Sequence, residues 1–143
     1  MEHMDVRITL KNAYDVGSHE RGIITEPEIH QATIQAMVDT GATYLVINRK
    51  LLQELGLNTV SQRRVSFVNG ADTVVHTAQI CKMTEPVEIH WEDRFITMPA
   101  LLVDDAQEIL LGVYPLEGMD LTVDPMNQQL VDAHGDVPTC YCY

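Results

Sequence analysis

The chain is poor in basic residues. It has nine Lys and Arg residues against 21 Asp and Glu residues, which gives a formal net charge of −12 over 143 residues. A surface this acidic repels the phosphate backbone of nucleic acids, and the sequence has no basic stripe that could neutralise phosphates. We therefore expect no nucleic-acid partner.

Long apolar runs and cysteines are also scarce. No apolar run approaches the roughly 18–20 residues that cross a bilayer, and residues 1–5 lack the basic start and the apolar stretch of a secretory signal. The three cysteines are too few for a disulfide framework and fit a reducing compartment, where thiols stay free. We therefore expect a cytoplasmic protein with no membrane partner.

Motifs for several common chemistries are missing. There is no Gly-x-Ser-x-Gly nucleophile elbow, no Gly-rich phosphate loop and no His-Glu-x-x-His motif. The six histidines show no paired spacing for zinc, and Cys140 and Cys142 have no further cysteines nearby to complete a metal site. We therefore expect neither a metal nor another cofactor.

The segments that are present are short, β-rich and separated by turns. Val6, Ile8 and Leu10 alternate with polar residues, as in a half-buried strand. One helix is predicted over residues 49–55, with Asn48 as its N-cap and Gly56 just after its end. Further extended segments are predicted at residues 22–30, 31–38, 87–91, 95–103, 109–111, 120–123 and 129–131, and a loop at residues 11–21.

Short strands at close spacing with little helix predict an all-β barrel or sandwich. Asn69-Gly70 lies between two β-rich runs, which is a strong signal for a β-hairpin. Residues 25–30 (TEPEIH) are similar to residues 84–90 (TEPVEIH), a likeness that chance can also produce.

One segment points to chemistry. An apolar strand ends at Asp39, which is followed directly by Thr40, Gly41 and Ala42. Gly41 allows the backbone to approach the carboxylate closely and donate to it, and the Thr40 hydroxyl can hold the turn rigid. Asp-Thr-Gly is also an ordinary turn sequence that arises by chance, so the tripeptide alone does not establish a catalytic site.

The order of the motifs is more specific than the tripeptide. Three motifs follow one another in a fixed order: Asp-Thr-Gly-Ala after two apolar residues, the Asn-Gly hairpin, and a later Ile-Leu-Leu-Gly at residues 109–112. This order resembles the retroviral-like (retropepsin) aspartic proteases, most of all their small cellular and bacterial members. The resemblance covers about residues 5–132. It implies a closed or partly open all-β barrel with one or two short helices, acting as a homodimer. It also implies one domain over residues 1–132 and a tail, 133–143, that can add a strand to the interface.

The resemblance assigns roles to individual residues. Asp39 would be the catalytic carboxylate, Thr40 would contact the other subunit, and Gly41, with Ala42, would line the substrate backbone and support the loop. The flap over the substrate would be Val68, Asn69, Gly70 and Ala71, and the support beneath the active loop would be Leu110, Leu111 and Gly112. Two features depart from the viral pattern: the flap lacks repeated glycines, and Val113-Tyr114-Pro115 replaces the helical segment expected after Gly112.

Aspartic proteases use two carboxylates that share one proton, because two close like charges cannot both ionise cheaply. This chain has one Asp-Thr-Gly: Asp72-Thr73 is followed by Val74, and Asp124 is followed by Pro125. The sequence therefore predicts a homodimer with a two-fold axis between paired Asp39 residues, which cleaves an extended peptide bound by strand addition. The alternative is a catalytically silent binding or assembly module of the same fold.

Overall fold

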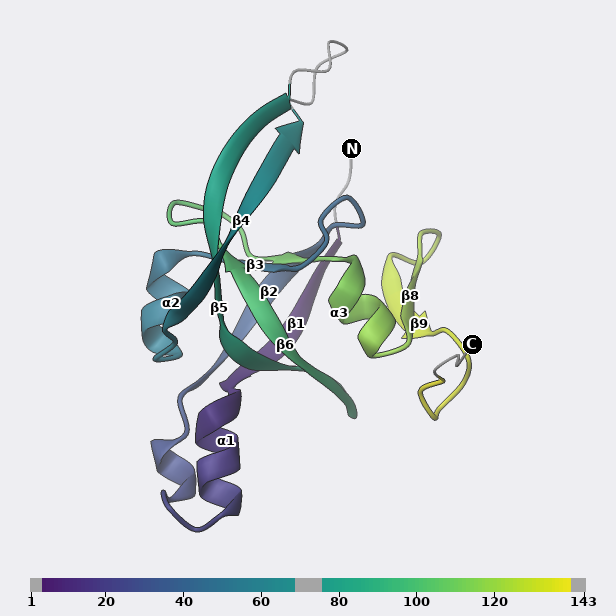
Figure 1. The fold of residues 1–143 in the computed structure, drawn as a ribbon. Coiled ribbons are helices and arrows are strands. Elements are labelled where there is room, and N and C mark those ends of the chain that lie inside the picture. Colours follow the sequence, from purple (N-terminus) through teal and green to yellow (C-terminus); the bar gives the residue numbers. More distant parts are fainter. Residues whose placement is uncertain (1–3, 69–75, 140–143) are drawn as a thin grey trace.

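The computed structural model describes residues 4–68 and 76–139, and Figure 1 shows it as a mostly β-stranded molecule with a few short helices. In chain order the elements are β1 (Met4–Asn12), α1 (Ala13–Glu20), the 3-10 turn η1 (Glu26–Glu28), β2 (Gln31–Val38), β3 (Leu45–Ile47), α2 (Arg49–Glu54), β4 (Thr59–Val68), β5 (His76–Trp91), β6 (Arg94–Leu102), β7 (Leu110–Leu111), α3 (Val113–Gly118), β8 (Leu121–Asp124) and β9 (Gln129–Asp132).

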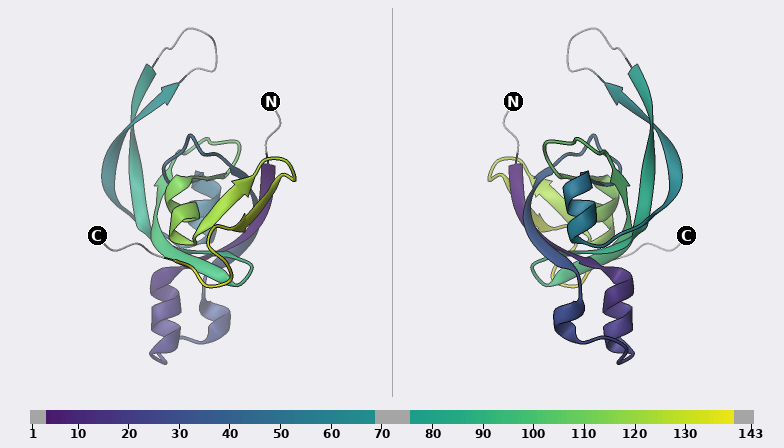
Figure 2. Two further views of the ribbon diagram at one scale, coloured as in Figure 1. Left: turned by 90° about the vertical axis from the view of Figure 1, so that its right-hand side faces the viewer. Right: turned by 90° about the vertical axis from the view of Figure 1, so that its left-hand side faces the viewer.

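Seven strands form one sheet in the order β1-β2-β7-β3-β6-β5-β4, and β1 also pairs with β5. Residues 87–90 of β5 pair with β1 on one side and β6 on the other, so six strands close into a ring. The strand β4 pairs with β5 alone, and these two strands extend beyond the ring as a long arm (Figures 1 and 2). The all-β, barrel-like fold expected from the resemblance is confirmed.

The core lies inside the ring and follows the alternation seen in the sequence. In β1, Ile8 and Leu10 are buried, whereas Asp5 and Arg7 are exposed. Because neighbouring strands repeat this pattern, their inward residues meet in one cluster, and full burial of each large apolar side chain contributes about 1.5–3 kcal/mol. Fully or almost fully buried members of this cluster include Ile8, Leu10, Leu45, Ile47, Leu55, Val87, Ile89, Leu111 and Met119.

Local end signals correctly identified the helix α2. The Asn48 side chain accepts a hydrogen bond from the Leu51 N–H at 3.0 Å, as an N-cap does. Gly56 has a φ of +59°, a backbone conformation that strongly favours glycine at a helix end. The hairpin of β8 and β9 is also confirmed, with Leu121 opposite Asp132.

The loop predicted for residues 11–21 is wrong, because residues 13–20 form α1. Its cap is Asn12, whose side-chain oxygen accepts from the N–H groups of Tyr14 at 3.0 Å and Asp15 at 3.2 Å. The amide of the same side chain donates to the carbonyls of Leu55 and Gly56. Asn12 therefore joins α1 to the end of α2, and this tertiary anchoring stabilises a helix whose polar, glycine-containing sequence is a poor helix former.

Two further expectations are corrected. Residues 22–30 are not extended, because they contain the 3-10 turn η1. Pro27 lies in its first turn, and a capping box between Thr25 and Glu28 stabilises its start. A helix does follow Gly112, since α3 begins at Val113. Pro115 is tolerated there because it lies in the first turn, where a backbone N–H would have no acceptor within the helix.

The end of the described chain is attached to the barrel by two buried polar residues. Arg94 donates to the carbonyls of Met119 and Asp120, at 2.8 and 2.7 Å, and to that of Gly135. The Asp120 carboxylate accepts from the Thr139 N–H at 2.9 Å. In the described part of the tail, residues 133–139 contain no strand, and Cys140 and Cys142 lie outside the described residues. No described helix is long and apolar enough to cross a membrane.

Candidate active site

The loop that carries Asp39 leaves β2 and enters β3, and both of its ends are held by one short strand. β7 runs parallel to β2, with Val38 opposite Leu111, and antiparallel to β3, with Leu45 opposite Leu111. The Asp39 N–H also donates to the Leu111 carbonyl at 3.0 Å. A strand inserted in this way fixes where the loop starts and where it ends.

The carboxylate of Asp39 is oriented from within its own loop. The Gly41 N–H donates to Asp39 Oδ1 at 2.8 Å, and the Ala42 N–H donates to the Asp39 carbonyl at 3.0 Å. A Cβ at Gly41 would lie only 3.1 Å from Asp39 Oδ1, so glycine gives the carboxylate room at this turn. Asp39 is half-buried, Thr40 and Gly41 are exposed, and the Thr40 side chain forms no hydrogen bond with any described residue.

The loop rests on Gly112 and the start of α3. A Cβ at Gly112 would lie 2.4 Å from the Tyr44 carbonyl oxygen and 2.6 Å from that of Ala42, so no side chain fits there. The N–H groups of Val113 and Tyr114, which have no partner inside α3, donate to the carbonyls of Ala42 and Thr43, each at 2.9 Å. The two backbone donors of α3 were not anticipated from the sequence, since that helix was not predicted.

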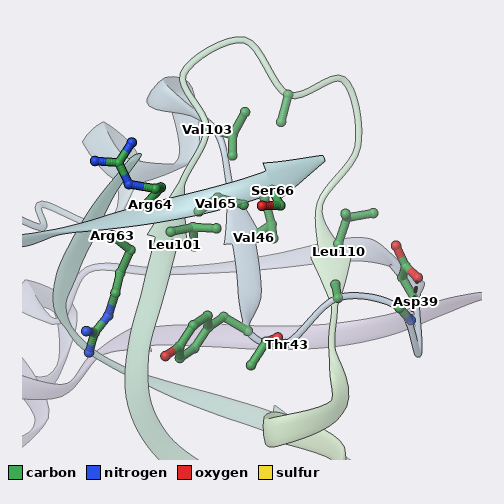
Figure 3. Close-up of a pocket in the computed structure, with 14 residues that line it drawn as sticks. Asp39, Thr43, Val46, Arg63, Arg64, Val65, Ser66, Leu101, Val103 and Leu110 are labelled. Atoms are coloured by element: carbon green, nitrogen blue, oxygen red, sulfur yellow. Dashed lines mark hydrogen bonds between the residues drawn. The ribbon is translucent and has the colours of Figure 1, made fainter. Parts of the chain in front are cut away.

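A groove of about 860 Å³ opens beside Asp39 (Figure 3). This volume lies within the range of about 300–1,000 Å³ typical of ligand sites. One wall is formed by β4. The sequence did not predict that β4 lines the site, because the position of β4 depends on the curvature of the β4–β5 arm relative to the barrel. The lining residues are Asp39, Gly41, Ala42, Thr43, Tyr44, Val46, Arg63, Arg64, Val65, Ser66, Leu101, Val103, Ala106 and Leu110.

The floor of the groove is apolar. Val46 and Leu101 line it and pack with Cys81 and Met83 in a second buried cluster, against which Val65 and Leu110 also pack. Burial raises the pKa of the Cys81 thiol, and the nearby negative charge of Asp104 raises it further. The raised pKa favours the neutral thiol of Cys81 over the more nucleophilic thiolate.

The charged groups in the groove are few. Asp39 is the only carboxylate among the lining residues, and Arg63 and Arg64 are the only cations. No group of three or more His, Cys, Asp or Glu residues in the described ranges could hold a metal ion. The described lining residues thus offer the chemistry of a single oriented carboxylate in a partly apolar groove.

The sequence-predicted site residues are distributed as follows. The structure brings Asp39, Gly41 and Ala42 together in the groove, with Leu110 in its lining and with Leu111 and Gly112 directly beneath the loop. The flap residue Val68 ends β4, opposite His76 at the start of β5. Asn69, Gly70 and Ala71 lie outside the described residues, so the turn they form stays a prediction.

The closed β-barrel and its single Asp-Thr-Gly loop define a class of protein, the retropepsin-like aspartyl proteases. Comparison with protein families matches residues 25–117 to the family described as "gag-polyprotein putative aspartyl protease". Because this match spans more than half of the chain, the chain belongs to that family, and the resemblance drawn from its motifs is confirmed.

One curated relative is DNA damage-inducible protein 1 of the yeast Kluyveromyces lactis, which is 28% identical to this chain over 103 residues. The matched region covers 72% of this chain and 24% of the relative. The chain therefore corresponds to about a quarter of that protein, and the likeness concerns one domain of it.

Proposed function

We propose that this protein is an aspartic endopeptidase that completes its catalytic pair across a homodimer, with Asp39 supplied by each chain. The observation that carries the proposal is the loop geometry. The Gly41 N–H orients Asp39, and Leu111 and Gly112 hold its loop from below. Asp39 opens onto a groove in which it is the only carboxylate among the described lining residues. A single chain therefore supplies half of the pair that this chemistry requires.

In the proposed reaction, one Asp39 carboxylate acts as general base on a water molecule. The other Asp39, protonated, donates to the oxygen of the scissile carbonyl, which gives a tetrahedral diol. The C–N bond then breaks as the first Asp39 passes the proton it took from water to the leaving amine and the second takes a proton back from a hydroxyl, with no covalent enzyme intermediate. The Gly41 N–H bonded to Oδ1 keeps the carboxylate plane fixed while the proton moves between the two chains. Thr40, exposed and without a hydrogen-bond partner in the described chain, is free to contact the second subunit.

The proposed substrate is an extended peptide. In the described part of the chain, β4 pairs on one side only, so its other edge is open to strand addition next to the groove. The groove is also lined by Gly41 and Ala42, where the backbone can approach a peptide closely. The flap from Val68 to Ala71 would then cover the bound peptide, and neither a metal nor a cofactor takes part. A cytoplasmic location also belongs to this proposal.

The first test is Asp39→Asn, a nearly isosteric change on an exposed loop. We expect it to abolish cleavage of a mixed peptide library while the far-ultraviolet circular dichroism spectrum and the sedimentation coefficient stay those of the wild-type protein. Cleavage that persists in this variant would reject the proposal. A wild-type protein that binds peptides and never cleaves them would instead establish the silent binding module.

Mixing the two proteins tests the dimer itself. When wild-type and Asp39→Asn chains are mixed in equal amounts and allowed to exchange, about one quarter of random dimers carry two Asp39 residues. We therefore expect the activity per total chain to fall to about one quarter. A fall to about one half would mean that each chain works alone, and the shared site would be wrong.

A further inference from the structure

Two arginines in the groove wall have no partner among the described residues. Neither Arg63 nor Arg64 forms an ion pair or a side-chain hydrogen bond with any residue in the described ranges, whereas Arg49 pairs with Asp104 and Arg94 with Asp132. The chain has only nine Lys and Arg residues in all. What distinguishes Arg63 and Arg64 is their place: they are the only basic residues among the described residues that line the groove of this acidic protein, and the catalytic loop makes no use of them.

The pairing of β4 with β5 separates the roles of the two arginines. Residues directly opposite one another in an antiparallel pair project from the same face of the sheet. Arg63 is opposite Cys81, which is buried in the cluster beneath the groove, whereas Arg64 is opposite Ile80, which is 55% exposed. Arg63 therefore shares the inner face with the apolar floor, and Arg64 lies on the outer face. Figure 3 shows the two guanidinium groups on opposite sides of β4.

The place of Arg63 favours a carboxylate ligand. A guanidinium binds a carboxylate through two parallel, charge-assisted hydrogen bonds. Arg63 is exposed and therefore accessible to a ligand, and a bound peptide that covers the groove would shield the pair from water and strengthen it. The net charge of −12 repels acidic peptides at long range, so an acidic side chain would be selected by direct contact and not by steering. In Figure 3, Asp39 lies at one end of the groove and Arg63 toward the other, so the residue recognised is not the one at the scissile bond.

We infer that Arg63 is a specificity-determining residue, which binds a Glu or Asp side chain of an extended peptide away from the scissile bond, with one such position for the Arg63 of each chain in the dimer. This inference rests on one part of the proposed function, namely that an extended peptide binds in the groove. Arg64, on the outer face of β4, contributes less. The acidic side chain replaces water on Arg63 while the peptide backbone pairs along the edge of β4.

The test measures binding in the Asp39→Asn background, where no peptide is cleaved. The probes are fluorescein-labelled decapeptides of Ala, Val, Ser and Gln that carry one Glu at each position in turn, each with a matched Gln peptide. We expect the Glu peptide to bind about tenfold more tightly than its Gln partner at one position, or at the two positions that the two-fold axis of the dimer relates, as one charge-assisted contact provides. A preference that is equal at all positions would mean long-range attraction, and the inference would be wrong.

Four substitutions locate the contact. Arg63→Gln should remove the preference for Glu and leave the affinity for the Gln peptide unchanged, while Arg64→Gln should keep most of it. Arg21→Gln is a remote control: Arg21 is exposed at the end of α1, at the far end of the molecule from the β4–β5 arm, and its loss changes the net charge equally. Arg63→Glu should reverse the preference toward a Lys peptide, which a merely structural role of Arg63 would not do.

The outcomes separate the two proposals. Equal loss of affinity for Glu and Gln peptides in Arg63→Gln would make Arg63 a structural residue and overturn the inference, and so would the absence of any peptide binding. Cleavage by the wild-type protein with no preference for Glu overturns the inference and leaves the peptidase standing. A preference for Glu that depends on Arg63, without cleavage by the wild-type protein, supports the inference and rejects the peptidase.

Discussion

Replacing Gly112 by Ala tests how the catalytic loop is held. Gly112 has a φ of −90°, which alanine adopts without strain, so the substitution probes space alone. The new Cβ would lie 2.4 Å from the Tyr44 carbonyl oxygen, 2.6 Å from the Ala42 carbonyl oxygen and 2.9 Å from the Ala42 carbonyl carbon. All three atoms are backbone, so no side chain can rotate away, and the loop and α3 must separate.

The expected cost has two parts. Overpacking by one methyl group in a tightly packed position costs about 1–3 kcal/mol. Separation also weakens the two hydrogen bonds from Val113 and Tyr114 to the loop, each with a net value of about 0.5–1.5 kcal/mol. We expect a loss of about 2–4 kcal/mol in the free energy of unfolding. The proposed peptidase activity should fall by at least about tenfold, because a small shift of a catalytic group is costly.

Urea unfolding measures the first effect, followed by the fluorescence of Trp91, the single tryptophan, which packs against the core. Gly17→Ala is the matched control: Gly17 lies within α1, and a Cβ there would meet nothing within 4 Å. That control should gain about 0.5–1 kcal/mol, because glycine weakens a helix interior. A Gly112→Ala protein with the wild-type urea midpoint and activity would refute the packing argument.

Two further changes test the polar contacts that organise the fold. Asn12→Ala removes the cap of α1 and leaves the buried carbonyl of Leu55 without its donor. Urea unfolding should therefore show a loss of about 2–3 kcal/mol in the free energy of unfolding. Asn12→Ser keeps an acceptor for the cap, so its loss should be smaller. The Thr139 N–H, together with a hydrogen bond from His134, lowers the pKa of Asp120. The folded state therefore favours the ionised Asp120, a contribution that is present above the usual Asp pKa and is lost as the pH falls below it. The stability difference between wild type and Asp120→Asn should shrink in urea midpoints taken from pH 6 down to pH 3, and a difference that stays constant would contradict this account.

Much of the fold could be predicted because its signals are local. Asn48 and Gly56 bound α2 through contacts within a few residues of themselves. The alternation of Ile8 and Leu10 identifies the buried face of β1 without reference to any other strand. Asp39-Thr40-Gly41 directs attention to the candidate site because an acid after an apolar strand, followed by glycine, is a local pattern as well.

Other elements depend on distant partners. Residues 25–30 and 84–90 have nearly the same sequence, yet the first holds the turn η1 and the second lies within β5. The difference arises because residues 87–90 form ladders with both β1 and β6. Within the described structure residues 25–30 form no ladder, and they meet a strand only where the Asn12 N–H donates to the His30 carbonyl at 3.0 Å. Likewise α1 depends on Asn12 reaching the end of α2, a contact between residues far apart in the chain.

The amino-acid sequence by itself determined the β-rich character of this protein, the loop with its single catalytic candidate and the family. Only the tertiary structure decided what surrounds Asp39. The insertion of β7 between β2 and β3, the start of α3 beneath the loop and the arrival of Arg63 in the groove wall all depend on strand register and curvature. Register is set by the packing of the whole barrel, so no short segment of sequence encodes it.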